Sequence, residues 1–279
     1  MPSSIELAPN TTWKQTIPPS NALDPATFAP FGEVIQNPRT HDGKPSLGTI
    51  QANQGTATKW LDVTHLENWY HLAPSGKTAR PVMNMFVCRP RKLLQERFFE
   101  VKVLERHPFT PQTFVPMGMG PQDRYLVIVA PTLKGRTTGR DGRDKPYPAE
   151  YTRPKKSLKE RLLGARPNPF TNDHEPCTTP SRSNLGPERK PKGSGEPDFD
   201  NIQAFIARGD QAVTYGPGTW HAPMVVLGKN EVEFVVVQYA NGVPLEDCQE
   251  VDLPNGQIAV DVNLDGAQAS APGIMRAKL

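Results

Sequence analysis

Two stretches decide the fold of this chain: Glu105-Arg106-His107-x4-Gln112-x5-Gly118 and Tyr215-Gly216-Pro217-Gly218-Thr219-Trp220-His221. Each sets imidazole, carboxyl or amide groups at the end of an alternating apolar run, beside a turn that contains glycine. Strands of a small barrel direct polar side chains into a shared cavity in this way. We therefore expect the two stretches to meet in space and to form one site.

Short apolar segments, rich in β-branched and aromatic residues and bounded by Gly, Pro, Asn or Asp, surround the two stretches and predict strands. They cover residues 82–88, 102–105, 112–117, 125–130, 202–207, 209–215 and 232–239. Their close spacing, with few helices between them, predicts an all-β fold, an antiparallel sandwich or barrel. Near the N-terminus, Asp24 and Pro25 predict a capped helical turn that leads into an edge strand at 31–35.

Composition divides the chain into a packed part and an unpacked part. Residues 131–197 are rich in Pro, Gly, Ser and Thr and hold 15 Lys and Arg against 8 Asp and Glu. They predict a basic, Pro/Gly-rich disordered insertion, because the segment has no sustained strand or helix period. The insertion interrupts a single barrel domain made of residues 21–130 and 198–262. Residues 1–20 and 263–279 are expected to be flexible ends.

Several classes of protein are excluded by what the sequence lacks. No apolar run is long enough to cross a membrane, and no signal peptide opens the chain, so we expect an intracellular protein without membrane partners. The basic insertion has no interleaved aromatics, which argues against nucleic acid as a partner. Cys88, Cys177 and Cys248 are too widely spaced for a disulfide framework. The final Ala277-Lys278-Leu279 is close to a peroxisomal address, so cytoplasm and peroxisome both stay open.

The polar residues at the strand ends share one predicted face. Glu105 and His107 are two residues apart on an extended backbone and so point the same way. Gln112 opens the next strand, and His221 follows a tight turn in the distant half. Each of these residues alone has a structural alternative: a hydrogen-bonded histidine, a solvated carboxylate, or, for Trp220, a wall of the core.

These motifs resemble those of a degenerate cupin. Glu105-x-His107-x4-Gln112-x5-Gly118 stands where cupins have His-x-His, Glu and Gly, and Pro217-Gly218-x-x-His221 stands where they have Pro-x-Gly-x-x-His. A more specific likeness is to the ureidoglycolate lyases of allantoin degradation, above all their fungal members. It is carried by Leu104-Glu105-Arg106-His107-Pro108, Gln112-x-Phe114-x-Pro116-Met117, Tyr215-x4-Trp220-His221-x-Pro223 and Asp247-Cys248-x-Glu250-Val251.

The resemblance implies a cupin-like antiparallel β-barrel, a double-stranded β-helix, that works as a homodimer. It implies cleavage of (S)-ureidoglycolate to glyoxylate and urea in purine catabolism and nitrogen utilisation. His107 or His221 is then the base, and Glu105 orients that imidazole or donates the proton. The open alternatives are a ureidoglycolate hydrolase that releases ammonia and a non-catalytic cupin that senses a small acid.

Substrate-binding residues are expected from the same resemblance. Asn53-Gln54-Gly55-x3-Lys59-Trp60 is similar to the family's Asn-Asn-Gly-x3-Arg-Tyr, with lysine in place of arginine. The substrate carboxylate needs a cation, for which Lys59, Arg80 and Arg89 are candidates. Gln112 and Asn53 are the expected amide contacts.

The sequence leaves open whether the predicted site binds a metal. His107, His221, Glu105 and Gln112 offer a mixed nitrogen and oxygen set for a divalent metal such as nickel, zinc, manganese or iron. A glutamine replaces the expected carboxylate, and a metal-free site stays equally open.

Overall fold

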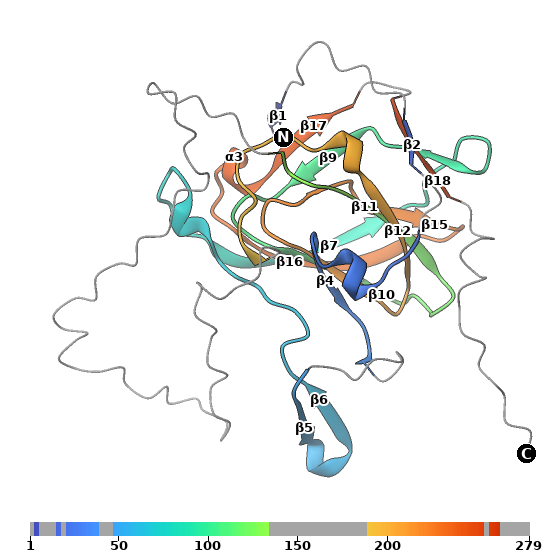
Figure 1. Cartoon of the computed structure of the whole chain (residues 1–279). Coiled ribbons are helices and arrows are strands. Elements are labelled where there is room, and N and C mark those ends of the chain that lie inside the picture. The colour runs from blue at the N-terminus through green and yellow to red at the C-terminus, as the bar shows by residue number, and fades with distance from the viewer. Residues whose placement is uncertain are drawn as a thin grey trace, which may run out of the picture.

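Two β-sheets packed face to face build the body of the protein (Figure 1). The computed structural model describes residues 3–5, 15–17, 21–38, 47–133, 189–253 and 257–262. The larger sheet contains, in spatial order, β1 (Ser3–Ile5), β17 (Gln249–Asp252), β9 (Val103–Arg106), β14 (Trp220–His221), β11 (Arg124–Ala130), β12 (Gln203–Arg208) and β3 (Asn21–Ala22), with β15 (Val225–Leu227) also paired to β11. The facing sheet contains β4 (Gly32–Ile35), β13 (Ala212–Tyr215), β10 (Gln112–Met117), β16 (Val232–Ala240) and β7 (Arg80–Cys88).

Alternation along β11 separates two cores. Tyr125 and Val127 point between the two sheets and pack with Phe114 and Phe234 of the facing sheet. Leu126 and Ile128 point to the other side of the larger sheet, where a second core forms. Because both faces of β11 are covered, its sequence is a continuous apolar run. The all-β prediction is thus confirmed.

A third, small sheet covers the outer side of the second core. It contains β2 (Gln15–Ile17), β18 (Ile258–Asp261) and β8 (Phe98–Glu100). β1 and β2 belong to the N-terminal segment that was expected to be flexible, and each pairs with a C-terminal strand. Both of these pairs and the β12–β3 pair are parallel, whereas the other strand pairs of the described residues are antiparallel, as predicted.

The two described ends of the basic insertion lie against each other and against the barrel. Thr132 and Pro197 form an antiparallel bridge, and the Leu133 amide donates to the Glu196 carbonyl at 2.9 Å. The packed domain therefore extends to residues 131–133 and 189–197, further than its composition indicated. The rest of the predicted insertion, which includes Cys177, lies outside the described residues, as do residues 263–279.

In the described part of the chain, helices are few and short: α1 (Pro25–Phe28), α3 (Pro244–Asp247) and the 3-10 turns η2 (Asn53–Gly55), η3 (Tyr70–Leu72) and η6 (Phe199–Asn201). The predicted cap of α1 is confirmed, because Asp24 accepts from the amides of Ala26 and Thr27. Within the described ranges, no helix has the length and apolar character needed to cross a membrane.

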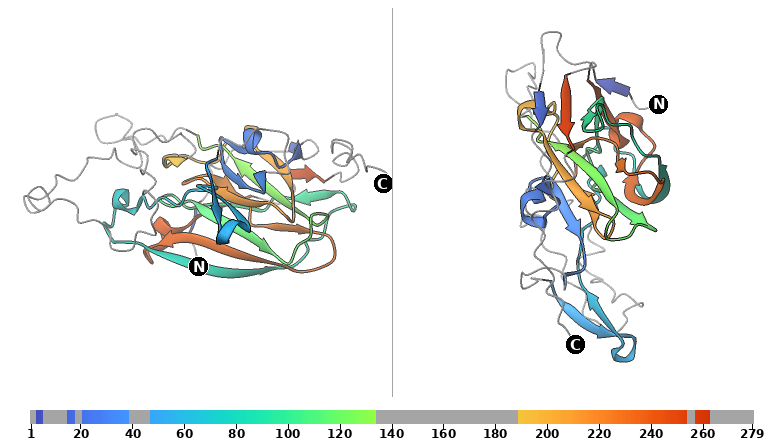
Figure 2. Two further views of the ribbon diagram at one scale, coloured as in Figure 1. Left: turned by 90° about the horizontal axis from the view of Figure 1, so that it is seen from below. Right: turned by 90° about the vertical axis from the view of Figure 1, so that its right-hand side faces the viewer.

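A two-stranded hairpin leaves the body of the molecule. It consists of β5 (Thr49–Ala52) and β6 (Ala57–Trp60), joined by the η2 turn. Figure 1 and the right-hand view of Figure 2 both show it extending away from the two packed sheets. It follows β4, which is an edge strand of the facing sheet.

Candidate active site

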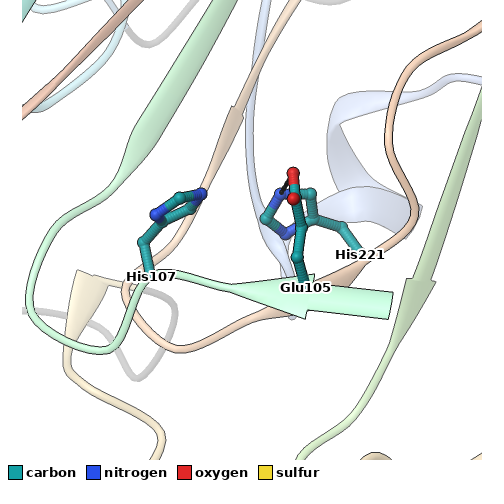
Figure 3. A group of neighbouring side chains, drawn as sticks. All are labelled: Glu105, His107 and His221. Carbon is teal, nitrogen blue, oxygen red and sulfur yellow. Dashed lines mark ion pairs between the residues drawn. The ribbon is translucent and has the colours of Figure 1, made fainter. Parts of the chain in front are cut away.

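Residues from both sides of the insertion meet inside the barrel. Glu105 lies on β9 and His221 on β14, and the two are direct cross-strand partners. His107 lies just beyond the end of β9, with its ring centroid 5.7 Å from that of His221. Figure 3 shows the three side chains gathered over the end of β9. Their possible ligand atoms all lie within 4.8 Å of one another, and we call these three residues the His–Glu cluster.

His107 presents one free nitrogen to this cluster. Its Nδ1–H donates to the Asp247 carbonyl at 2.6 Å, which leaves the lone pair on Nε2. Nε2 is buried and, among the described residues, has no hydrogen-bond partner. Burial lowers the pKa of His107, although the charge of Glu105 opposes the shift. His107 is thus held as a neutral imidazole with an available basic nitrogen.

The carbonyl that orients His107 is itself fixed by its own residue. The Asp247 carboxylate accepts from the Tyr70 hydroxyl at 2.7 Å and from the amides of Asn241 and Gly242 at 2.8 and 2.7 Å. These three bonds hold the end of α3 beneath the imidazole. Sequence reasoning missed this support, although Asp247 belongs to one of the motifs that carry the family resemblance.

His221 has the opposite hydrogen-bond environment. Its Nδ1–H donates to the Thr219 carbonyl at 2.9 Å, and Nε2 faces two oxygens, Gln112 Oε1 at 3.0 Å and Glu105 Oε1 at 3.4 Å. Both oxygens are hydrogen-bond acceptors, so Nε2 faces groups to which a ring N–H would donate. The ring stacks on Tyr215 with centroids 3.9 Å apart. His221 is therefore placed to act as a proton donor.

Glu105 stays ionised in this environment. Burial would raise its pKa, but the hydrogen bond and charge of His221, helped by His107, outweigh burial and lower it. Glu250 is its direct cross-strand neighbour on β17, and burial together with the charge of Glu105 raises the pKa of Glu250. The half-buried Cys248 is also close, and burial raises the pKa of its thiol to about 12. The sequence did not reveal these two neighbours, because the pairing of β9 with β17 joins positions far apart in the chain.

A cavity of about 550 Å³ lies between β7 and β9, and we call it the substrate cavity. Of the His–Glu cluster, Glu105 lines it. Its walls include Phe86, Cys88, Glu105, Phe114 and Met224, and its rim includes Arg89, Arg91 and Glu231. Arg89 donates to Glu231 at 2.9 Å, and the Arg91 guanidinium lies over the Phe99 ring at 5.5 Å. Both cations that border the cavity are thus engaged with other residues.

The other predicted binding residues are divided between the cavity and distant positions. Gln112 contacts His221 and donates to Gln238 Oε1 at 2.8 Å, so it belongs to the site. Arg80 begins β7, at the end of the strand opposite Arg89. Asn53 and Lys59 lie on the projecting hairpin, which Figure 1 shows pointing away from the barrel. Within one chain, the structure does not bring these last three residues to the cavity.

Arg106 lies between Glu105 and His107 in the sequence, so its side chain points to the opposite face of the chain and supports the site from behind. Arg106 is 2% exposed and donates to Gln249 Oε1 and to the carbonyls of Gly193, Ser194 and Gly195. Its guanidinium stacks on Trp220 at 4.4 Å, and Trp220 Nε1 also donates to the Gly195 carbonyl. The strap formed by residues 193–195 therefore supports both strands that carry the His–Glu cluster.

The donor set also fits a divalent metal. A neutral imidazole whose Nδ1 is fixed by a carbonyl and whose Nε2 is free is the usual form of a metal-binding histidine. Glu105 and His221 complete a mixed nitrogen and oxygen set, with Gln112 beside them.

Comparisons with known proteins agree on one family. Residues 14–261 match the family model described as ureidoglycolate lyase. A ureidoglycolate lyase of Schizosaccharomyces pombe is 32% identical over 234 residues, covering 82% of this chain and 88% of the relative. One from Saccharomyces cerevisiae is 30% identical over 255 residues, covering 86% and 96%. One from Burkholderia mallei is 28% identical over 232 residues, covering 83% and 86%.

Proposed function

The chain belongs to the ureidoglycolate lyase family, and on this premise we propose that it cleaves (S)-ureidoglycolate to glyoxylate and urea in the substrate cavity. The substrate carries a hydroxyl group, a carboxylate and a ureido group on one carbon. Cleavage needs the hydroxyl proton removed while the departing nitrogen gains one.

The observation that carries the proposal is the buried Nε2 of His107, which has no described partner and faces Glu105 and His221. A neutral imidazole with a lone pair that no hydrogen bond uses is suited to accept a proton. Buried polar atoms of side chains are as a rule hydrogen-bonded, so an unpaired ring nitrogen calls for a functional explanation.

The elimination follows from the different hydrogen-bond environments of the two imidazoles. His107 Nε2 accepts the hydroxyl proton, the oxygen forms the carbonyl of glyoxylate, and the carbon–nitrogen bond breaks. The electron pair goes to the urea nitrogen, which takes the proton from His221 Nε2. Glu105 lies 3.4 Å from His221 Nε2 and orients its ring. Proton transfer of this kind contributes about 10²- to 10⁴-fold to the rate.

A divalent metal such as nickel is part of the proposal as an optional cofactor. Glu105, His107 and His221 would hold it, with Gln112 as a further oxygen ligand, and the ion would act as a Lewis acid toward the hydroxyl and carboxylate of the substrate.

We also propose that the protein is a homodimer. The outer side of the β10–β16–β7 sheet carries an apolar face made of Met83, Met85, Val87, Val115 and Met117. Met83, Met85 and Val87 are 71%, 52% and 55% exposed. Val235 lies between Met85 and Val115, whereas the exposed Glu233 lies between Val87 and Met117. A mainly apolar patch of this kind on a sheet face is typical of a surface that another protein covers.

The test is the product balance of the purified protein with racemic ureidoglycolate, with and without a chelator. We expect urea and glyoxylate in equal amounts and no ammonia. Ammonia in place of urea would show a hydrolase, and the absence of any product would leave only a binding protein. His107→Asn is the matched variant, because the shorter amide retains a donor for the Asp247 carbonyl but has no basic nitrogen.

A further inference from the structure

We propose that the β5–β6 hairpin is an arm that docks on a second copy of the chain and delivers Lys59 to the substrate cavity of that copy. The inference rests on the proposed function, since Lys59 would bind the carboxylate of the same substrate. Each site would then consist of one barrel and the partner's arm.

The hairpin is not a stable unit by itself. It has two strands of four residues, and Figures 1 and 2 show it standing clear of the packed sheets. An isolated two-stranded hairpin is at best marginally stable in water. Its apolar residues Ile50 and Trp60 are only half-buried by the arm itself. A surface of another molecule is needed to cover them.

The tip of the arm is strained in a way that needs support. Asn53 and Gln54 have φ of 48° and 56°, and Gly55 continues the left-handed run at 87°. Non-glycine residues in this conformation cost on the order of 1 kcal/mol each and cluster at ligand-binding positions. Within the arm, Asn53 is held by bonds from the amide and hydroxyl of Thr56 to its carbonyl. The strain favours a tip that is shaped for a contact outside its own chain.

The position of the arm identifies the second copy as its docking partner. The arm follows β4, one edge of the sheet whose outer side is the apolar face, and β7 is the opposite edge. If two copies pack these faces around a two-fold axis parallel to the strands, β4 of one copy lies against β7 of the other. The end of β7 forms a wall of the substrate cavity. In this proposed arrangement, the arm of each copy would lie on the side of the partner's cavity.

Charge explains why Lys59 is the residue delivered. Arg89 and Arg91 border the cavity, but the first is bound to Glu231 and the second lies over Phe99. The His–Glu cluster supplies a carboxylate, which repels the carboxylate of the substrate. Lys59 is exposed on β6 and brings a compact positive charge. It would offset the acidic group and bind the substrate carboxylate.

Mixed dimers test the inference directly. Lys59→Ala and His107→Asn chains are expressed separately and together, and urea release is measured. We expect each variant alone to be inactive or nearly so. With random pairing, half of the dimers are mixed and each contains one intact site, so about a quarter of the wild-type activity should return.

Recovery on mixing supports an arm that acts across the dimer, and an inactive mixture overturns it. His107→Asn mixed with His221→Asn is the negative control, since both residues lie in one barrel. Lys102→Ala, an exposed lysine on the loop before β9, controls for loss of positive charge and should retain full activity. Full activity of Lys59→Ala alone would also refute the inference while leaving the proposed function intact.

A readout without turnover separates the two proposals if the wild-type protein proves inactive. We expect the amides of residues 49–60 to be protected from hydrogen exchange in the wild-type protein and to lose protection in Met85→Glu, which introduces a charge into the apolar face. Rapid exchange of the arm in both proteins would overturn the docking.

Discussion

Replacing Arg106 should destabilise the protein severely, although the residue does not touch the substrate cavity. The guanidinium is buried and makes hydrogen bonds of 2.8, 3.0, 2.8 and 3.1 Å to Gln249 Oε1 and to three successive carbonyls of the strap. Bonds to a charged group contribute about 1.5 to 3 kcal/mol each, and they do not add fully within one network. We expect Arg106→Ala to lower the free energy of unfolding by about 3 to 5 kcal/mol.

Arg106→Lys separates the effect of the positive charge from the effect of the planar guanidinium group with its several N–H donors. A lysine retains the positive charge but cannot bond all three carbonyls while stacking on Trp220, so we expect a loss of about 2 kcal/mol. Urea unfolding followed by tryptophan fluorescence measures both changes. Arg124→Ala is the control, because Arg124 donates to two loop carbonyls at the surface and should cost less than about 1 kcal/mol. An Arg106→Ala loss no larger than that of the control would refute the role of the strap.

Three further predictions concern the base, a half-buried ion pair and a glycine. His107→Asn should lower kcat/KM for ureidoglycolate by about 10²- to 10⁴-fold with little change in melting temperature; near-normal turnover would exclude His107 as the base. The hydrogen bond to Glu33 raises the pKa of His65 above 6.5, and His65 lowers the pKa of Glu33 below 4.5 despite the opposing effect of burial. The stability that the raised pKa of His65 contributes is lost as pH rises through the folded pKa of His65, and the stability that the lowered pKa of Glu33 contributes is lost as pH falls through the folded pKa of Glu33. The pair is therefore fully formed between these two values, and His65→Gln should lower the melting temperature most near about pH 5.5 and less at about pH 9. An effect independent of pH would contradict this. In Gly32→Ala the new methyl group would lie 1.9 Å from the Thr214 carbonyl oxygen, so β4 should separate from β13 and soluble yield should fall, whereas a wild-type melting temperature would show that the strand pair tolerates the change.

Local patterns predicted the strands that place the site. Residues 112–117 alternate and are bounded by turns, and β10 spans the same residues. The rule that residues two apart on a strand share a face placed Glu105 and His107 together, and the glycine turn before His221 directed that ring to the same point. These features depend on the two-residue period of side chains along a strand and on the residue types of a turn, and both can be recognised from residues that are neighbours in the sequence.

Features that depend on register between distant segments were not predictable from the sequence. The pairing of Glu250 with Glu105, and the contact of Arg106 with residues 193–195, join positions far apart in the chain. The short β1 and β2 pair with C-terminal strands and have no alternation of their own to reveal them. The arm extends away from the packed sheets, so the separation of Lys59 from the cavity in its own chain was visible only in three dimensions.

The most direct test of the account is the stoichiometry of products formed by wild-type protein and by His107→Asn from (S)-ureidoglycolate. The account predicts one urea and one glyoxylate for each substrate consumed by the wild-type protein, no ammonia, and a rate at least about a hundredfold lower for the variant. Release of ammonia, or equal rates for the two proteins, would contradict it.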